Sequence, residues 1–249
     1  MALRLLLISF LLLPSAALCG GSGNFKLSMP ADALYPASGA ALNLMAVYFT
    51  RNAKSPGAGP EGFCAWPEFN FSKPGENAGT ILTAAGVLSL PFLLDNFDFP
   101  QTATVAVMYL ETAMLAWGTK DLLKGLFPKF RPYVSFDDTP EELLKEKDHF
   151  FSFPSGHSTI AFATASFSTF IFSKSEASTL SKVLFSVCNF GLASGVGVLR
   201  IVSGNHYFVD VLSGAAIGSV YGVLIPLSHQ NKSVTPQFDG KSLGLRVEF

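Results

Sequence analysis

The stretch GVLRIVSGNHYFVDVLSG, residues 197–214, places one arginine, one histidine and one aspartate in an otherwise apolar segment. From Val183 to Ser228 the only formally charged side chains are Arg200 and Asp210, and His206 lies between them. An ionisable group at the centre of a bilayer costs about 2.5 to 3.5 kcal/mol on insertion scales. These three residues therefore either satisfy one another or bind something.

The composition favours a membrane protein. Of the 249 residues, 49% are hydrophobic and 14% are charged, and the mean hydropathy is +0.38. Soluble domains carry about 25% charged residues. The net charge of -1 gives no nucleic-acid footprint, so no nucleic-acid partner is expected. The three cysteines show no metal-ligand or CxxC spacing, which argues against a zinc or redox site.

Residues 1–20 have the features of an export signal. One arginine precedes an apolar core, and Pro14 is followed by small residues that suit a cleavage site. Two alternatives are an uncleaved membrane anchor and a lipoprotein modified at Cys19. Leu18 fits the second poorly, because a small residue is expected directly before the modified cysteine.

Apolar runs recur along most of the remaining chain and predict an all-α helical bundle of the polytopic membrane type. Each run approaches the 17 to 25 residues that cross a bilayer. A soluble all-α bundle is the alternative, since buried helices have similar hydropathy. The runs cover residues 80–95, 102–118, 157–173, 183–199 and 207–227.

These runs divide the chain into four parts. After the leader, residues 21–78 are rich in Gly, Pro and Asn, and predict loops with a weak apolar helix at 33–49. Pro36, Ser38 and Asn43 argue against that helix crossing a bilayer. Residues 79–230 form the predicted helical domain, and residues 231–249 form a C-terminal tail.

The tail ends in KSLGLRVEF, where Leu243, Leu245, Val247 and Phe249 alternate as in the last strand of an outer-membrane barrel. Such a barrel needs eight or more strands, and one strand cannot close it. The sequence therefore favours a flexible tail.

The longest charged interruption contains TPEELLKEKDH, residues 139–149. Thr139 as N-cap, Pro140 at the first helical position and Glu142 closing a capping box predict a short helix. Glu141 and Lys145 add a favourable i,i+4 pair. A solvated surface helix is the simpler interpretation, and a lid over a site is the alternative.

Two motifs flank this predicted short helix, one on each side in the sequence. In KGLFPKFRP, Lys124 and Arg131 are seven residues apart, so both cations face the same way if a helix continues through Pro128. Alone, this pattern is typical of a solvated helix end. In FPSGHS, Ser155 and Gly156 directly precede an apolar run that begins at His157, and free backbone N–H groups at a helix start bind anions.

The opening stretch adds a third motif. His206 and Asp210 stand at i and i+4, which predicts one helical face on which the carboxylate accepts from one ring nitrogen. The other nitrogen is then a directed lone pair, as a nucleophilic imidazole requires. Arg200 offers a donor fork matched to phosphate oxygens. The alternative is a buried ion pair of Arg200 and Asp210 with a bystander histidine.

Taken together, the three motifs resemble the signature of the type 2 phosphatidic acid phosphatase superfamily, which also contains bacterial acid phosphatases and vanadium haloperoxidases. That signature is K-x6-RP, then PSGH, then SR-x5-H-x3-D, and its order and spacings all occur here. Leu199 departs from it by replacing the serine before Arg200. The resemblance covers roughly residues 80–228.

The resemblance implies a role for each matched residue. His206 is expected to attack phosphorus, Asp210 to orient it, and His157 to protonate the leaving alkoxide and then to help activate water. No metal or other cofactor is implied, because arginine and lysine stabilise the phosphoryl charge. The implied phosphate-binding residues are Lys124, Arg131, Ser155, Gly156 and Arg200.

The expected function is a metal-independent phosphatase for a lipid phosphate or pyrophosphate, of the phosphatidate or polyprenyl pyrophosphate type. If residues 33–49 do not cross the membrane, the site is expected on the outer or periplasmic face. Lys174 and Lys182 flank the connection after the run at 157–173, and positive residues favour a cytoplasmic position for that connection, which also places the site outside. One alternative is a soluble periplasmic acid phosphatase for small phosphomonoesters. Another is a non-enzymatic envelope protein with a decayed site, for which Leu199 is the hint. A haloperoxidase ranks last, because the chain has little room for extra helices.

Overall fold

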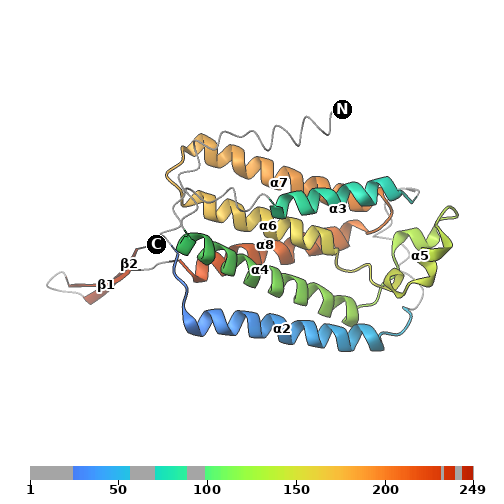
Figure 1. Cartoon of the computed structure of the whole chain (residues 1–249), viewed down its shortest axis with the longest axis horizontal. Helices are drawn as coiled ribbons and strands as arrows, with labels where there is room; N and C mark the ends of the chain where they lie inside the picture. Colours follow the sequence, from blue (N-terminus) through green and yellow to red (C-terminus); the bar gives the residue numbers. More distant parts are fainter. Residues whose placement is uncertain (1–24, 57–70, 89–98, 231–232, 239–242, 249) are drawn as a thin grey trace.

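The protein is described from a computed structural model, which covers residues 25–56, 71–88, 99–230, 233–238 and 243–248. The predicted signal or anchor, residues 1–20, lies outside these ranges. Within them, six long helices lie side by side as a bundle, with short helices at one end and a β-hairpin at the other (Figure 1). The predicted all-α bundle is confirmed.

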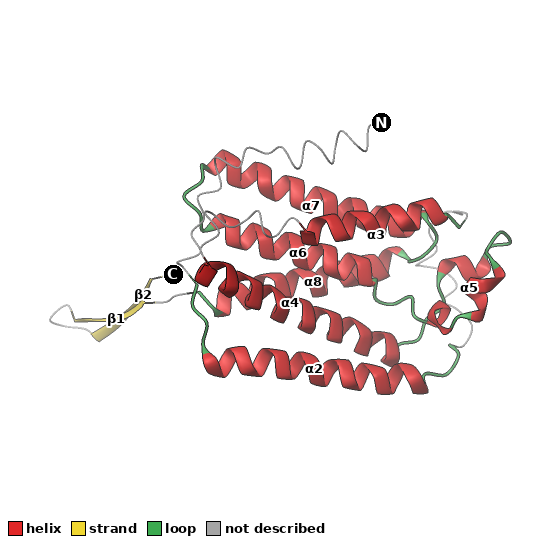
Figure 2. Ribbon diagram, viewed as in Figure 1, coloured by secondary structure: helices red, strands yellow, loops and turns green. Residues whose placement is uncertain are grey.

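The helices follow the apolar runs closely. Four of the five predicted runs coincide with a helix or lie within one, and the first begins inside a helix that starts seven residues earlier, at Lys73. Figure 2 shows how little of the described chain is not helical. The long helices are α2 (Met29–Asn52), α3 (Lys73–Leu88), α4 (Phe99–Leu126), α6 (Gly156–Ser173), α7 (Thr179–Val202) and α8 (Phe208–Ser228). The shorter elements are η4 (Pro132–Ser135), α5 (Glu141–Lys145), η5 (Lys147–Phe150), β1 (Ser233–Phe238) and β2 (Leu243–Glu248).

Helix α6 is central to the bundle, since it packs against α3, α4, α7 and α8. Its closest neighbour is α8, which presents Gly214, Gly218 and Gly222 at four-residue spacing. A Cβ atom built on Gly218 would lie 2.1 Å from the carbonyl oxygen of Thr159. Small residues at this spacing let two helix backbones approach closely. The glycines of α8 therefore fix its position against the helix that begins with the PSGH motif.

Replacing Gly218 with alanine should destabilise the bundle by about 1–3 kcal/mol, because the added methyl group meets backbone that cannot move aside. The free energy of unfolding, measured by SDS titration in mixed micelles, checks this. Gly195→Ala is the matched control, because nothing lies within 4 Å of a Cβ at that position of α7. It should leave stability unchanged or raise it slightly. Equal stability of the two variants would contradict the close α6–α8 packing.

The segment expected to be mostly loop contains the long helix α2. It spans 24 residues and packs along α4. Asn43, whose amide argued against a bilayer span, donates to the carbonyl oxygens of Gly39 (2.7 Å) and Met114 (3.4 Å). At 1.5 Å per residue α2 is about 36 Å long, enough to cross about 30 Å of hydrocarbon. Length alone would let α2 span, but α2 is not among the described helices that are also apolar enough to cross a membrane. The doubt that Pro36, Ser38 and Asn43 raise about a span at residues 33–49 is therefore not removed by the length of the helix.

The outer surface of the bundle is apolar. Among the described helices, α7 and α8 are long and apolar enough to cross a membrane. Large apolar side chains are exposed on them, away from the bundle interior. A lipid environment accounts for such a surface, whereas water does not. The protein is therefore membrane-associated. The exposed side chains include Leu180, Val183, Leu184 and Val187 of α7, and Leu212, Val220 and Leu224 of α8.

The short helix after the first motif begins later than the sequence predicts. Its N-cap is Pro140 rather than Thr139, whose hydroxyl instead donates to the carbonyl oxygen of Tyr133 at 2.6 Å. The predicted pair of Lys145 and Glu141 is present at 3.4 Å, and both side chains are exposed. Leu143, Glu146 and Asp148 also contribute to the wall of a cavity described below.

The C-terminal tail is a hairpin rather than a flexible segment. Strands β1 and β2 are antiparallel, and Val234 pairs with Val247 in their register. The alternation in residues 243–248 thus coincides with a strand. Its partner is the preceding segment of the tail, and this local pairing needs no closed barrel.

Candidate active site

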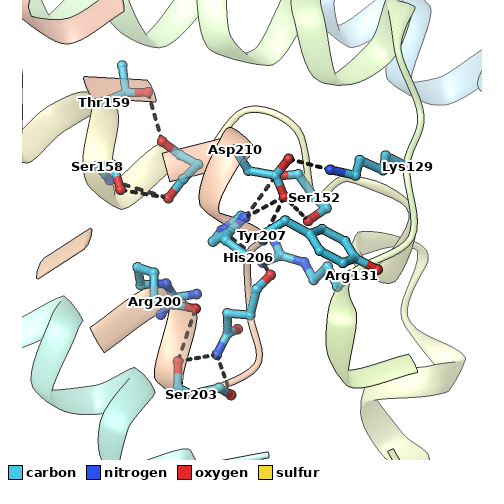
Figure 3. A network of polar contacts seen from close by, with 12 residues as sticks. Lys129, Arg131, Ser152, Ser158, Thr159, Arg200, Ser203, His206, Tyr207 and Asp210 are labelled. Carbon is cyan, nitrogen blue, oxygen red and sulfur yellow. Dashed lines mark hydrogen bonds and ion pairs between the residues drawn. The ribbon is translucent and has the colours of Figure 1, made fainter. Parts of the chain in front are cut away.

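The three sequence motifs meet at one end of the bundle. Lys124 lies in the last turn of α4, His157 in the first turn of α6, Arg200 in the last turn of α7, and His206 in the connection before α8. All four line one cavity of about 580 Å³, together with Arg131 and Gly156. Figure 3 shows His206, Arg131 and Asp210 close together, with Arg200 nearby.

Helix α4 ends at Leu126, before Pro128, so Lys124 and Arg131 do not share a helical face as the spacing predicts. Arg131 instead reaches the cavity through an extended segment. The N–H groups of Lys129 and Arg131 donate to the carbonyl oxygens of Phe150 (2.7 Å) and His149 (3.0 Å). This ladder fastens the first motif beside the chain that leads into the PSGH motif.

His206 lies before α8 begins at Phe208, so it does not stand above Asp210 on one helical face. Its Nδ1 is 2.7 Å from the carbonyl oxygen of Ser152 and 3.9 Å from Oδ2 of Asp210. A carbonyl oxygen only accepts, so Nδ1 carries a proton. Nε2 is 3.1 Å from Nη1 of Arg131, which only donates. The ring is therefore neutral, with its Nε2 lone pair directed at the cavity cations.

Burial keeps this imidazole neutral. His206 is 2% exposed. Removal from water, and secondly the nearby guanidinium of Arg131, hold the pKa of His206 well below its usual value. A lowered pKa means that the neutral form persists as the pH falls below 6.5. The ring thus remains a nucleophile in mildly acidic solution.

Asp210 is fully buried and tightly held. Its Oδ1 accepts from Nζ of Lys129 at 2.8 Å, and its Oδ2 accepts from Oγ of Ser152 at 2.6 Å and from the backbone N–H of Tyr207 at 3.0 Å. Ser152 therefore forms hydrogen bonds to both His206 and Asp210. Its carbonyl oxygen accepts from Nδ1 of His206, and its hydroxyl donates to Asp210. Ser152 thus links Asp210 to His206 by two hydrogen bonds.

Sequence reasoning missed Lys129 and Ser152. Each stands two residues before a residue that the motifs name, Lys129 before Arg131 and Ser152 before Pro154. Their proximity to the motifs is a weak signal, because only the fold shows that both face Asp210.

The two arginines differ in how they are bound. Arg131 donates from Nη2 to Oδ2 of Asp148 at 2.6 Å and from Nε to the carbonyl oxygen of the same residue at 3.1 Å. Arg200 is 2% exposed, yet its Nε and Nη1 donate to none of the described residues. Buried donors without acceptors are costly. A guanidinium at a cavity wall with unused donors is suited to bind an anion there.

The PSGH turn contributes unequally to the cavity. Ser155 caps α6, and its Oγ accepts from Oγ of Ser158 at 3.0 Å, so it is not among the residues of the cavity wall. Gly156 and His157 are in the wall. Nε2 of His157 is 3.0 Å from Oγ1 of Thr80 in α3. The structure therefore does not bring the Ser155 hydroxyl to the other predicted phosphate ligands.

Lys120 is a further cation that the motifs do not contain. It lies one helical turn before Lys124, is buried, lines the cavity, and pairs with Asp121. Its Nζ also lies 3.9 Å from the ring centroid of Trp117. Leu199, the residue that departs from the signature, is not in the cavity wall and faces Gly79 of α3.

The cavity wall carries few possible metal ligands. Asp148 is bound by Arg131, and cations outnumber carboxylates in the wall. Among the described residues, the His, Asp and Glu side chains close enough to share a metal ion lie elsewhere, at Asp32, Glu111 and His229. The donor set of the cavity therefore suits an anion rather than a metal ion.

Curated relatives match part of the chain. A PA-phosphatase related-family protein of Dictyostelium discoideum is 37% identical over 113 residues, which are 42% of this chain and 41% of that protein. The lipid A 1-phosphatase of Porphyromonas gingivalis is 40% identical over 73 residues, which are 29% of this chain and 15% of that protein. The chain thus aligns with less than half of the length of either relative.

Two solved structures are also similar. LpxE of Aquifex aeolicus has 24% identity and a TM-score of 0.43, covering 62% of this chain and 86% of that chain. A transmembrane PAP2-type phosphatidylglycerolphosphate phosphatase from Bacillus subtilis has 22% identity and a TM-score of 0.39, covering 90% of this chain and 94% of that chain. The family model of the PAP2 superfamily matches residues 104–233, more than half of the chain and all three motifs. The chain belongs to the PAP2 superfamily, that of the type 2 phosphatidic acid phosphatases.

Proposed function

We propose that this protein is a metal-independent phosphatase that hydrolyses a lipid phosphate or pyrophosphate through a phosphohistidine on His206. The observation that carries the proposal is the state of that ring. Nδ1 is fixed as a donor to Ser152, and Nε2 is a lone pair facing a cavity with Arg131 and Arg200 in its wall. A neutral, oriented nucleophile beside cations is what phosphoryl transfer needs.

In the first step, Nε2 of His206 attacks phosphorus, and the bond from phosphorus to the ester oxygen breaks. His157, also in the cavity wall, takes up a proton when the anionic substrate offsets the surrounding cations, and donates it to the leaving alkoxide. Arg131 exchanges its contact with Nε2 for a phosphate oxygen, and Arg200 supplies its unused donors. The positive charge on the ring is stabilised by the buried carboxylate of Asp210, 3.9 Å from Nδ1.

In the second step, water attacks the phosphohistidine and gives its proton to His157. The bond from phosphorus to Nε2 breaks, inorganic phosphate leaves, and His206 returns to its neutral form. Lys124, together with the missed residue Lys120, lies where charge on the phosphoryl oxygens needs stabilisation. The gathering of His206, His157 and the cations in one cavity also argues against a decayed site.

A lipid substrate is supported by the surroundings of the cavity. The wall continues from the cations to the apolar side chains of Ala84, Trp117, Leu143 and Ile160. The helices that form the cavity also carry the apolar outer surface described above. One relative is named for action on lipid A, a phosphorylated lipid. A phosphate at the membrane interface would meet the cations while its chains contact the apolar wall.

A substrate panel tests the lipid class. Phosphatidate, a polyprenyl pyrophosphate and a small phosphomonoester are compared by phosphate release from the detergent-solubilised protein. At least one long-chain substrate should have a kcat/KM about a hundredfold above that of the small ester, because burial of chain methylenes contributes about 0.8 kcal/mol each. Equal kcat/KM values across the panel would favour the soluble type of acid phosphatase.

Chelation tests the metal-independent chemistry. Initial rates in excess EDTA should equal those without it, because lysine and arginine side chains neutralise the phosphate. Circular dichroism of the same samples verifies that the protein stays folded. A loss of rate in folded protein that Mg²⁺ restores would contradict the proposal.

We further place the site on the outer face of the membrane. Lys174 and Lys182 flank the connection of α6 to α7, at the end of the bundle away from the cavity, and positive residues favour cytoplasmic loops. The length of α2 works against this placement, because an additional span after an exported leader would turn the cavity to the cytoplasm. Hydrolysis of an impermeant substrate by intact spheroplasts, but not by inside-out vesicles, is the result expected for the outer face.

A further inference from the structure

Three side chains that the proposed phosphatase chemistry does not use meet inside the bundle. Asp32 comes from the first turn of α2, Glu111 from the middle of α4, and His229 directly follows α8. Nε2 of His229 lies 2.7 Å from Oδ1 of Asp32 and 3.4 Å from Oε2 of Glu111. His206 and His229 flank opposite ends of α8, whose 21 residues span about 30 Å. The cluster is therefore remote from the catalytic cavity.

Glu111 lacks hydrogen bonds. It is 0% exposed, and neither of its carboxylate oxygens accepts one from any described residue. A buried carboxylate without hydrogen bonds costs several kcal/mol. The nearest positively charged or chargeable atom is Nε2 of His229. A cation in contact with its oxygens would satisfy this carboxylate.

The tautomer of His229 shows which atom faces that cation. Nδ1 is 2.9 Å from the carbonyl oxygen of Ile225, which only accepts, so Nδ1 carries the proton and Nε2 is directed at the two carboxylates. Metal-binding histidines typically donate their second ring nitrogen to a backbone carbonyl in this way. A proton on Nε2 would satisfy Asp32 but would leave Glu111 without a hydrogen bond.

We propose that Asp32, Glu111 and His229 bind one divalent transition-metal ion that ties α2 to α4 and α8. The three ligand atoms lie within 4.8 Å of one another. Tetrahedral zinc with bonds of about 2.0–2.1 Å needs ligand atoms about 3.3 Å apart. The 3.4 Å between Nε2 of His229 and Oε2 of Glu111 matches this spacing, whereas Oδ1 of Asp32, now at 2.7 Å from Nε2, has to move back to admit the ion. Two carboxylates and a neutral imidazole also give a neutral site with a divalent ion. A ligand set of one imidazole and two carboxylates suits Zn²⁺.

Solvent has a route to this site. The side chain of Asp32 is 15% exposed, and an adjacent cavity of about 560 Å³ is lined by Tyr35, Ile225 and Ser228. Next to it, the backbone N–H of Lys26 donates to the carbonyl oxygen of His229 at 2.9 Å. The proposed ion is structural, because it joins three helices far from the catalytic cavity.

Metal analysis of the full-length protein, purified without a histidine tag, tests the site. The protein is stripped with EDTA, reloaded with Zn²⁺, freed of excess metal and measured by mass spectrometry. About one zinc per chain and a higher Tm with Zn²⁺ are expected. Glu111→Gln, which keeps the side-chain shape, and His229→Ala should weaken zinc binding about tenfold or more. His149→Ala, a histidine at the other end of the bundle, should retain both the zinc and the Tm shift.

Two results would overturn the proposal. One is wild-type protein that holds no zinc and whose Tm does not respond to it. The other is zinc held equally by the wild type, Glu111→Gln and His229→Ala. In either case the cluster is a proton-sharing group of buried side chains. Phosphate release is not a readout in this experiment, so its outcome is independent of the phosphatase proposal.

Discussion

His206→Ala should abolish phosphate release, with kcat reduced about 10⁵-fold, the scale of loss seen when a nucleophile is removed from an enzyme that forms a covalent intermediate. Alanine has no atom that can attack phosphorus, while the cations that bind the substrate remain. KM should therefore change far less than kcat. Phosphate release from the preferred long-chain substrate measures both.

Two controls keep this prediction falsifiable. Because His206 is buried, the alanine leaves a cavity, so His206→Gln serves as a second variant of similar size whose amide is a poor nucleophile. His149→Ala removes a histidine near the rim, which stacks on Phe130, and should keep wild-type rates. Folded His206 variants that retain more than about 1% of wild-type kcat would exclude the phosphohistidine mechanism.

His157→Ala should show a leaving-group dependence. Protonation of an alkoxide contributes about 10²- to 10⁴-fold, so the rate of phosphoryl transfer from a lipid ester should fall by that factor. p-Nitrophenolate leaves without a proton, so transfer from p-nitrophenyl phosphate should be nearly unaffected. Water attack on the phosphohistidine also needs this residue. A burst of one p-nitrophenolate per site followed by slow turnover is therefore expected in stopped-flow absorbance.

The contact of His157 with Thr80 provides a matched comparison. Thr80→Val removes the hydroxyl that lies 3.0 Å from Nε2 but keeps the size of the side chain. Its effect should be smaller than that of His157→Ala and without a burst. Equal losses for alkyl and p-nitrophenyl esters in His157→Ala would assign the proton transfer to another group.

Much of the site follows from the sequence, because motif spacing records which helix ends meet. Lys124, His157, Arg200 and His206 lie at or next to the ends of four helices, and the predicted runs placed the ends beside His157, Arg200 and His206 to within about three residues. The run at residues 102–118 stopped eight residues before the end of α4, where Lys124 lies. The orientation of His206 could not be predicted in this way. Its Nδ1 donates to the backbone carbonyl oxygen of Ser152. Every residue has such a carbonyl, so the residue types alone do not indicate which one accepts this hydrogen bond.

Other differences have similar physical causes. Hydropathy underestimated α2, since the amide of Asn43 is satisfied by backbone carbonyls, one of them on α4. The first motif is not helical throughout, because Pro128 and the ladder to residues 149–152 compete with the helix. The hairpin depends on pairing between two segments of the tail, which alternation in one strand cannot show.

The most direct test of the central claim is rapid-quench labelling with a ³²P-labelled substrate, applied to the wild type and to His157→Ala. The account predicts a base-stable, acid-labile phosphoenzyme at up to one label per chain. Its label should be on Nε2 of His206, it should persist longest in His157→Ala, and it should be missing from His206→Gln. Label on another residue, or turnover with no labelled protein at any quench time in either enzyme, would contradict the proposed intermediate.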